Sequence, residues 1–220
     1  IYDHPKDDGW MIDRAQVTEG VAETSQRVGS IHYRLGEIAA AVPYFRRALE
    51  LREQALQQQP GNATVRSNLA YSYLAVAEAQ FRLGDDDAAR PLYERCLELR
   101  QLPAGEAGDA NARKELADAQ YMLGQFRFRT GDLGGAATAL QQSCTLRQQL
   151  VDQDAQTIDW RRRLASSHFL LGQVADRQGD SRLAAEHFTA ARGLREQVAA
   201  TDPDSERYQA ELMVVLPHAG

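Results

Sequence analysis

The sequence contains little cysteine and no excess of positive charge. Its two cysteines, Cys96 and Cys144, fall in apolar stretches where a buried thiol is usual, so no disulfide framework or CxxC site is expected. Chains without disulfides are typical of reducing compartments, so we expect a cytoplasmic location. The net charge of −6 argues against nucleic acid as a partner, because proteins that bind nucleic acid carry basic patches.

Long apolar runs are also absent. No stretch approaches the about 20 apolar residues that a membrane-spanning helix needs, so we expect no membrane insertion by this chain. No signal peptide is visible, and the first residue is Ile1 rather than methionine. We therefore expect the chain to be a piece of a longer protein.

Catalytic and cofactor motifs are missing as well. His32, His168 and His187 are scattered, without the HExxH spacing of a zinc site. His168 and His187 are expected to be packing residues. The glycines that recur are single turn residues, and none opens a phosphate-binding loop before a basic residue. Catalysis needs a nucleophile, a base and an orienting group brought together, and no such set is visible. We expect neither an enzyme nor a cofactor or metal site.

A short turn, glycine followed by a carboxylate, recurs along the chain. The spacings between successive glycines are 48, 47 and 48 residues, which indicates a repeat protein. Glycine adopts positive φ easily and closes a helix, and the carboxylate can cap the next helix. Each repeat is therefore predicted to be a hairpin of a first and a second helix. The four turns are Gly36-Glu37, Gly84-Asp85, Gly131-Asp132 and Gly179-Asp180.

Apolar residues spaced three, four or seven apart predict the helices. Pro60-Gly61, Pro103 and Pro203 interrupt the pattern and mark boundaries between repeats. A further apolar stretch after Glu206 has the spacing of the start of a fifth hairpin. We expect an irregular lead-in at 1–10, four repeats within 11–201, at 11–59, 62–103, 109–153 and 155–201, and a partial repeat or cap at 204–220.

Small and large residues occupy fixed places relative to the turn glycine, as a stacked helical core requires. Alanine stands five residues after each glycine, where a small residue lets two helices approach closely, and again fourteen before it. A small residue, glycine or alanine, also stands seven before it. Large residues, expected to fill the space between hairpins, stand nine after it: Phe45, Tyr93, Leu140 and Phe188.

These places resemble the tetratricopeptide repeat, over about Met11 to Thr201. The family's unit is about 34 residues, so each helix here would be roughly two turns longer. The resemblance implies an all-α fold, a right-handed α-solenoid of four antiparallel hairpins plus a C-terminal partial repeat or cap. Stretches such as TLRQQLVDQDAQTIDWRRRLASSHFLLG are similar to long bacterial repeats found beside serine/threonine kinase or caspase-like protease domains.

In that family the first helices line a concave groove that binds polypeptide. Carried over by register, the groove positions lie thirteen, ten, six, three and two residues before each turn glycine. The candidate partner-binding residues are Arg34, Arg82, Arg129, Arg177, Tyr33, Phe81, Phe128, Leu74, Tyr121, Phe169, Glu78, Gln125 and Gln173.

The arginines two residues before each glycine form a complete column and allow two interpretations. They can bind carboxylates of a partner as a ladder, with the aromatics holding apolar side chains. They can instead complement the helix dipole, bond the last carbonyls or pair with the carboxylate of the turn. The first interpretation predicts a partner segment with acidic and apolar residues.

A second column of arginines follows the leucines of the second helices: Arg52, Arg100, Arg147 and Arg195. Acidic residues nearby favour a solvated, salt-bridged face for this column. The run Arg161-Arg162-Arg163 opens a first helix, where cations oppose the helix dipole, and the sequence offers no physical reason for it.

The predicted function is a protein–protein interaction scaffold. One alternative is a regulatory or sensor arm that docks on a catalytic domain of the same bacterial signalling protein. If that parent protein were a membrane-anchored receptor kinase, the location would be extracytoplasmic. Another alternative is self-association through the C-terminal helix.

Overall fold

The computed structural model describes residues 14–101, 109–202 and 205–213. Over these residues the chain forms helices and no strand, and most pairs of consecutive helices pack against each other. The all-α fold of successive hairpins predicted from the sequence is therefore confirmed. No helix among the described residues is long and apolar enough to cross a membrane.

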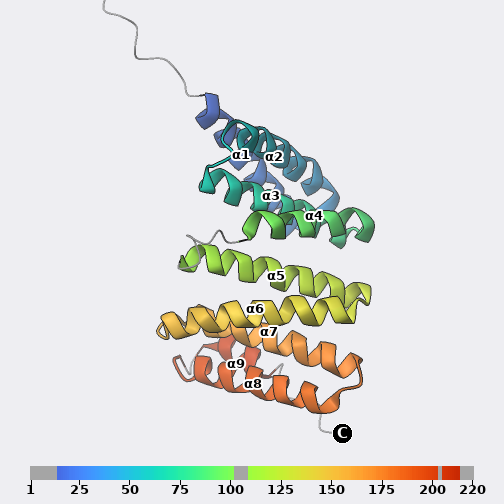
Figure 1. Ribbon diagram of the computed structural model, residues 1–220, viewed down its shortest axis with the longest axis vertical. Coiled ribbons are helices and arrows are strands. Elements are labelled where there is room, and N and C mark those ends of the chain that lie inside the picture. Colours follow the sequence, from blue (N-terminus) through green and yellow to red (C-terminus); the bar gives the residue numbers. More distant parts are fainter. Residues whose placement is uncertain (1–13, 102–108, 203–204, 214–220) are drawn as a thin grey trace, which may run out of the picture. The chain divides into compact units, whose positions relative to one another are not determined.

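The helices fall into two compact units, divided between Leu99 and Arg100. In Figure 1 the first unit runs from blue to green and the second from yellow-green to red. The first unit holds α1 (Arg14–Arg34), α2 (Ile38–Gln58), α3 (Ala63–Arg82) and α4 (Asp86–Arg100), of which α4 ends on the first residue of the second unit. The second holds α5 (Ala110–Thr130), α6 (Leu133–Gln153), α7 (Ile158–Arg177), α8 (Ser181–Ala199) and α9 (Glu206–Met213).

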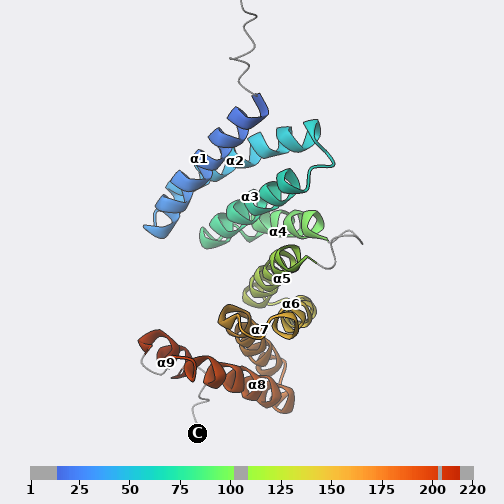
Figure 2. The same cartoon turned by 90° about the vertical axis from the view of Figure 1, so that its left-hand side faces the viewer.

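Figure 2 shows the two helices of a hairpin side by side, as in the pairs α1–α2 and α7–α8. The glycine turns join them. Gly36, Gly84, Gly131 and Gly179 have φ between 81° and 89°, and no other described residue has a positive φ. This left-handed backbone is open to glycine without steric penalty, which is why the turn falls there.

Three of the four turn carboxylates cap the helix that follows. An Oδ1 atom accepts a backbone N–H at 3.1 Å for Asp85, 2.9 Å for Asp132 and 2.9 Å for Asp180. Glu37 makes no cap and contacts His32 Nδ1 at 2.6 Å instead. The predicted N-caps are thus confirmed for aspartate, whose short side chain reaches the N–H three residues on.

The small residues let the two helices of a hairpin approach. A Cβ atom added to Gly29 would lie 2.6 Å from the Phe45 ring, and one added to Gly172 would lie 2.6 Å from the Phe188 ring. The large residues therefore rest on a small residue of their own hairpin. Phe45 also packs on Val76 of the next hairpin, so the space between hairpins is only part of what it fills.

Candidate functional site

The first helices of the four hairpins are α1, α3, α5 and α7. We define the first-helix face as the residues ten, six, three and two places before each turn glycine. The structure places the four arginines of this face, Arg34, Arg82, Arg129 and Arg177, on the surface. Phe81 is buried, with 7% of its surface exposed. The remaining candidates are half-buried: Tyr33, Phe128, Leu74, Tyr121, Phe169, Glu78, Gln125 and Gln173.

In the first unit, three candidate residues, Tyr33, Glu78 and Arg82, are linked through Tyr33. Glu78 accepts hydrogen bonds from the hydroxyls of Tyr33 at 3.0 Å and Tyr93 at 2.8 Å. The Arg82 guanidinium lies 5.3 Å from the centroid of the Tyr33 ring. Burial, followed by the negative charge of Glu78, raises the pKa of Tyr33 to about 12. Tyr33 therefore stays protonated near neutral pH and continues to donate to Glu78.

In the second unit, the same pair of positions meets again. The Arg177 guanidinium lies 4.8 Å from the centroid of the Phe128 ring, and its Nη1 donates to the Phe128 carbonyl at 3.0 Å. In both units, an arginine two places before its glycine lies over the aromatic ring three places before the preceding glycine. The contacts that position Arg82 and Arg177 therefore come from the preceding repeat, and they leave both side chains exposed to solvent.

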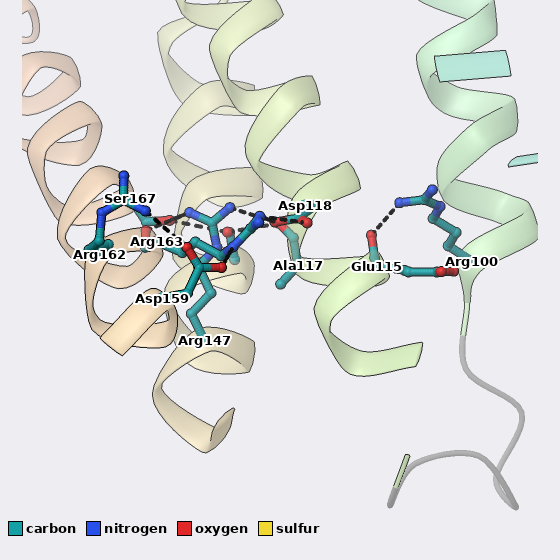
Figure 3. Close-up of polar contacts among 10 residues, drawn as sticks. Arg100, Glu115, Ala117, Asp118, Arg147, Asp159, Arg162, Arg163 and Ser167 are labelled. Atoms are coloured by element: carbon teal, nitrogen blue, oxygen red, sulfur yellow. Dashed lines mark hydrogen bonds and ion pairs between the residues drawn. The ribbon is translucent and has the colours of Figure 1, made fainter. Parts of the chain in front are cut away.

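The second column of arginines differs from expectation. Arg52 and Arg147 are buried, with 5% and 4% of their surface exposed, so a solvated face was the wrong prediction for them. Arg147 donates through Nη1 to the Arg163 carbonyl at 2.6 Å and to Ser167 Oγ at 2.7 Å (Figure 3). Its Nη2 donates to Asp118 at 2.9 Å. Burial lowers the pKa of Arg147, and the charge of Asp118 opposes that shift.

Arg52 repeats this arrangement in the first unit. Its Nη1 donates to the Asn68 carbonyl at 3.3 Å and to Ser72 Oγ at 2.8 Å, and its Nη2 donates to Glu19 at 2.9 Å. We call this set of contacts an arginine bridge. In it, an arginine of a second helix donates to two groups of the next hairpin, namely the carbonyl sixteen places and the serine hydroxyl twelve places before the next turn glycine. It joins consecutive hairpins within each unit.

Arg100 makes the carbonyl contact alone, donating to Glu115 at 2.7 Å (Figure 3). Alanine, Ala119, stands where the other bridges have serine. The serines, in register with the arginines, are the signal in the sequence that identifies the complete bridges.

The basic run at the start of α7 is neutralised by neighbouring carboxylates. Arg163 Nη1 contacts the two Asp118 oxygens at 2.9 and 3.0 Å, and its Nε contacts Asp159 at 2.5 Å. Arg162 contacts the other oxygen of Asp159 at 3.0 Å. Arg161 donates to the Ala155 carbonyl. The run thus holds the start of α7 to α5 rather than presenting a basic patch.

The chain is built of helical hairpins of near-constant length. A glycine turn joins the two helices of each hairpin, and the hairpins stack in chain order within each unit, which defines a helical-repeat protein. Two family models, both described as tetratricopeptide repeat, match residues 21–60 and 70–101. Residues 21–60 and 70–101 therefore match the tetratricopeptide repeat, and the resemblance seen in the sequence is confirmed. Such repeats generally serve as binding modules.

Solved structures show the same fold at low identity. The apo form of RapI has 15% identity and a TM-score of 0.67 over 90% of this chain. BtubC from P. vanneervenii has 20% identity and a TM-score of 0.62, over 86% of this chain and 69% of that one. A putative kinesin light chain from Podosopora anserina, with nearly identical TPR-like repeats, has 16% identity and a TM-score of 0.52, over 88% and 84%.

The chain spans about half of RapI, 47% of its length. A comparison with curated proteins found no match. These likenesses concern the fold alone.

Proposed function

We propose that the chain is a scaffold that binds polypeptide segments with acidic and apolar residues on the first-helix face of each unit. The observation that supports this most is the state of Arg82 and Arg177. Each guanidinium is held over an aromatic ring yet remains exposed. A guanidinium fixed in this way loses little further freedom when it binds a carboxylate through two parallel N–H···O hydrogen bonds.

The neighbouring residues fit the apolar part of such a segment. Leu74 in the first unit, and Tyr121 and Phe169 in the second, are half-buried, so each offers part of its apolar surface to a partner. The half-buried amides of Gln125 and Gln173 can serve the backbone of a bound segment. Contacts of this kind describe a site for an extended or helical segment rather than for a small molecule.

The test begins with selection of peptides from a random display library on the full chain. We expect enrichment of peptides that combine Asp or Glu with Leu or Phe. The variant Arg82→Glu/Arg177→Glu should bind the selected peptides at least about tenfold more weakly, equivalent to about 1.4 kcal/mol. Arg47→Glu is the matched control, because Arg47 has 56% of its side chain exposed on a second helix.

Thermal unfolding monitored by circular dichroism separates lost binding from lost structure. Enrichment of basic peptides, or equal binding by the charge-reversed variant and the parent, would contradict the proposal. The segment can belong to a separate protein or to another part of the same polypeptide, such as a kinase or protease domain. A search for the selected sequence in the full reading frame distinguishes these sources.

A further inference from the structure

One carboxylate on the first-helix face of the first unit is kept away from its natural partner. Glu78 stands four residues before Arg82 on α3, and a glutamate four places before a cation ordinarily pairs with it along a helix. The Glu78 oxygens instead accept the hydroxyls of Tyr33 at 3.0 Å and of Tyr93 at 2.8 Å. Between the described side chains of Glu78 and Arg82 there is no ion pair. The two charges therefore stay separate on neighbouring turns of one helix.

A single tyrosine lies near both charges. The Tyr33 hydroxyl binds Glu78, while the Arg82 guanidinium lies 5.3 Å from the centroid of the Tyr33 ring. Burial, followed by the negative charge of Glu78, raises the pKa of Tyr33, and the positive charge of Arg82 opposes that rise. Tyr33 therefore positions a negative and a positive group near each other without letting them neutralise one another.

The Glu78 carboxylate has capacity for a further donor. An ionised carboxylate offers about four lone-pair positions, and the two hydroxyls use one on each oxygen. Glu78 is half-buried, so part of its surface remains open to solvent. A lysine ammonium on its flexible stem can reach such a group and donate to it. A bound segment with a base at Glu78 and an acid at Arg82 would place each charge against its opposite.

The second unit carries a neutral version of the same arrangement. Gln173 stands six places before its turn glycine, where the first unit has Glu78. The residues that correspond in register to the two tyrosines are Phe128 and Phe188, which have no hydroxyl to donate. The carboxylate and both of its hydroxyl donors thus occur together in the first unit, and the second unit replaces all three. The two first-helix faces therefore differ in charge next to an arginine that they share.

We propose that Glu78 makes the first unit select a segment in which a basic residue accompanies the acidic one, whereas the second unit selects the acidic residue alone. This inference rests on the proposed function, because Arg82 takes the acidic residue of the segment. Residues four apart on a helix have Cβ atoms about 5 to 6 Å apart. The matching spacing in the segment is three or four residues if it is helical, and two residues, about 6.6 Å, if it is extended. Such a segment carries both signs of charge.

Peptide display on two variants of the full chain examines the two faces separately. Arg177→Gln leaves the first-unit face intact, and Glu78→Gln/Arg82→Gln leaves the second-unit face intact. We expect both to enrich peptides that combine Asp or Glu with Leu or Phe. Only Arg177→Gln should also enrich Lys or Arg at two, three or four places from the acidic residue. Enrichment of such a basic residue by both variants alike, or by neither, would overturn the inference.

A double-mutant cycle then separates recognition by Glu78 from a structural role. A peptide selected on Arg177→Gln is synthesised with its basic residue and with glutamine in its place, and fluorescence anisotropy gives the Kd of each. On Arg177→Gln, the glutamine peptide should bind at least about tenfold more weakly, and on Glu78→Gln/Arg177→Gln the two peptides should differ by less than about twofold. Glu94→Gln/Arg177→Gln is the matched control, because Glu94 is exposed on α4 of the same hairpin, and it should keep the tenfold difference.

The outcomes distinguish this inference from the proposed function. If Glu78 only supported the fold, its replacement would weaken both peptides equally and the tenfold preference for the basic residue would remain. Peptides that need Arg82 but keep that preference on Glu78→Gln/Arg177→Gln would overturn the inference and leave the proposed function standing. Failure to enrich any peptide, or binding that depends on neither Arg82 nor Arg177, would overturn the proposed function and this inference with it. Circular dichroism checks that each variant remains folded.

Discussion

Arg147 is a charged residue held inside a helical core, 4% exposed and bonded to a carbonyl, a serine and a carboxylate. Taking a charge out of water is costly unless its donors are satisfied and a counter-charge is near. Asp118 supplies the counter-charge, and it also binds Arg163. One buried arginine thus joins α5, α6 and α7.

Replacing Arg147 with methionine keeps much of the side-chain length and removes every donor. We expect Arg147→Met to lower the free energy of unfolding by about 3 kcal/mol, at the lower end for breaking a buried pair because Asp118 keeps Arg163. Urea unfolding followed by circular dichroism measures it. Arg47→Met, at a side chain 56% exposed, should change stability by less than about 0.5 kcal/mol. Equal effects of the two substitutions would refute the role assigned to the bridge.

The sequence could not predict these buried arginines on local grounds. Each follows a leucine in a stretch rich in polar residues, which is also the pattern of a solvated helix face. Two of the acceptors of Arg147 lie on α7, sixteen and twenty residues away in the chain, and one of them is a backbone carbonyl. Every residue has a backbone carbonyl, so the residue type does not identify this acceptor. The contact becomes visible only once the hairpins are stacked.

At the scale of helices, the approach of α7 to α8 depends on a glycine. Gly172→Ala should lower the free energy of unfolding by about 1 to 3 kcal/mol, because the new Cβ would lie 2.6 Å from the Phe188 ring. Gly20→Ala is the matched control, since nothing lies within 4 Å of a Cβ added there. It should raise stability by about 0.5 to 1 kcal/mol through helix propensity. Thermal unfolding of both variants checks the opposite signs.

In the second hairpin, Ala77 stands in place of the glycine where the two helices approach each other. Its large residue is Tyr93, whose hydroxyl donates to Glu78 at 2.8 Å. The alternation of small and large residues could therefore be predicted from the sequence. Which partner each large residue contacts could not, because a ring can point into its own hairpin or into the next.

A histidine pair also joins α7 and α8. The Nδ1 atoms of His168 and His187 are 3.2 Å apart. Burial lowers the pKa of His168, and the charge of His187 lowers it further. Burial lowers the pKa of His187 as well, although Glu186 opposes this. Both folded pKa values therefore lie below the unfolded value of about 6.5.

Because both histidine pKa values are lower in the folded state, the unfolded chain binds protons at a higher pH than the folded chain does. The stability from the neutral pair is fully present above about pH 6.5 and declines as pH falls through the lowered folded values. We expect the free energy of unfolding to fall between neutral and mildly acidic pH, and to fall less in His168→Gln/His187→Gln. Urea unfolding across this range measures the slope. An unchanged slope in the double variant would show that other groups set the pH dependence.

At the scale of the whole chain, each unit contains what a helical repeat needs to fold. The first unit holds the core around Phe45 and the bridge of Arg52. The second holds the core around Leu140 and the bridge of Arg147. The free energy of unfolding of such an array is approximately the sum of the stabilities of its repeats and of the interfaces between neighbouring repeats. We expect fragments 1–101 and 109–220 to be helical and to unfold cooperatively when each is produced alone.

Far-UV circular dichroism and thermal unfolding of the two fragments check this expectation. A fragment without a cooperative transition would show that its unit depends on the other. The repeat period and the hairpins could be predicted from the four glycine turns, because a turn is a local event. The division at Leu99 could not, because it depends on how many contacts cross each point of the chain.

The arginine bridge has a consequence for how such a chain can change over generations. One of its acceptors in the next hairpin is a backbone carbonyl, at Asn68, Glu115 and Arg163 alike, and this contact does not depend on the residue type there. A gene segment encoding 47 or 48 residues carries an arginine for its successor and a carbonyl for its predecessor. When one such segment is copied or deleted, the hairpins on either side can again form the arginine-to-carbonyl hydrogen bond. The array is therefore easy to lengthen or shorten by recombination.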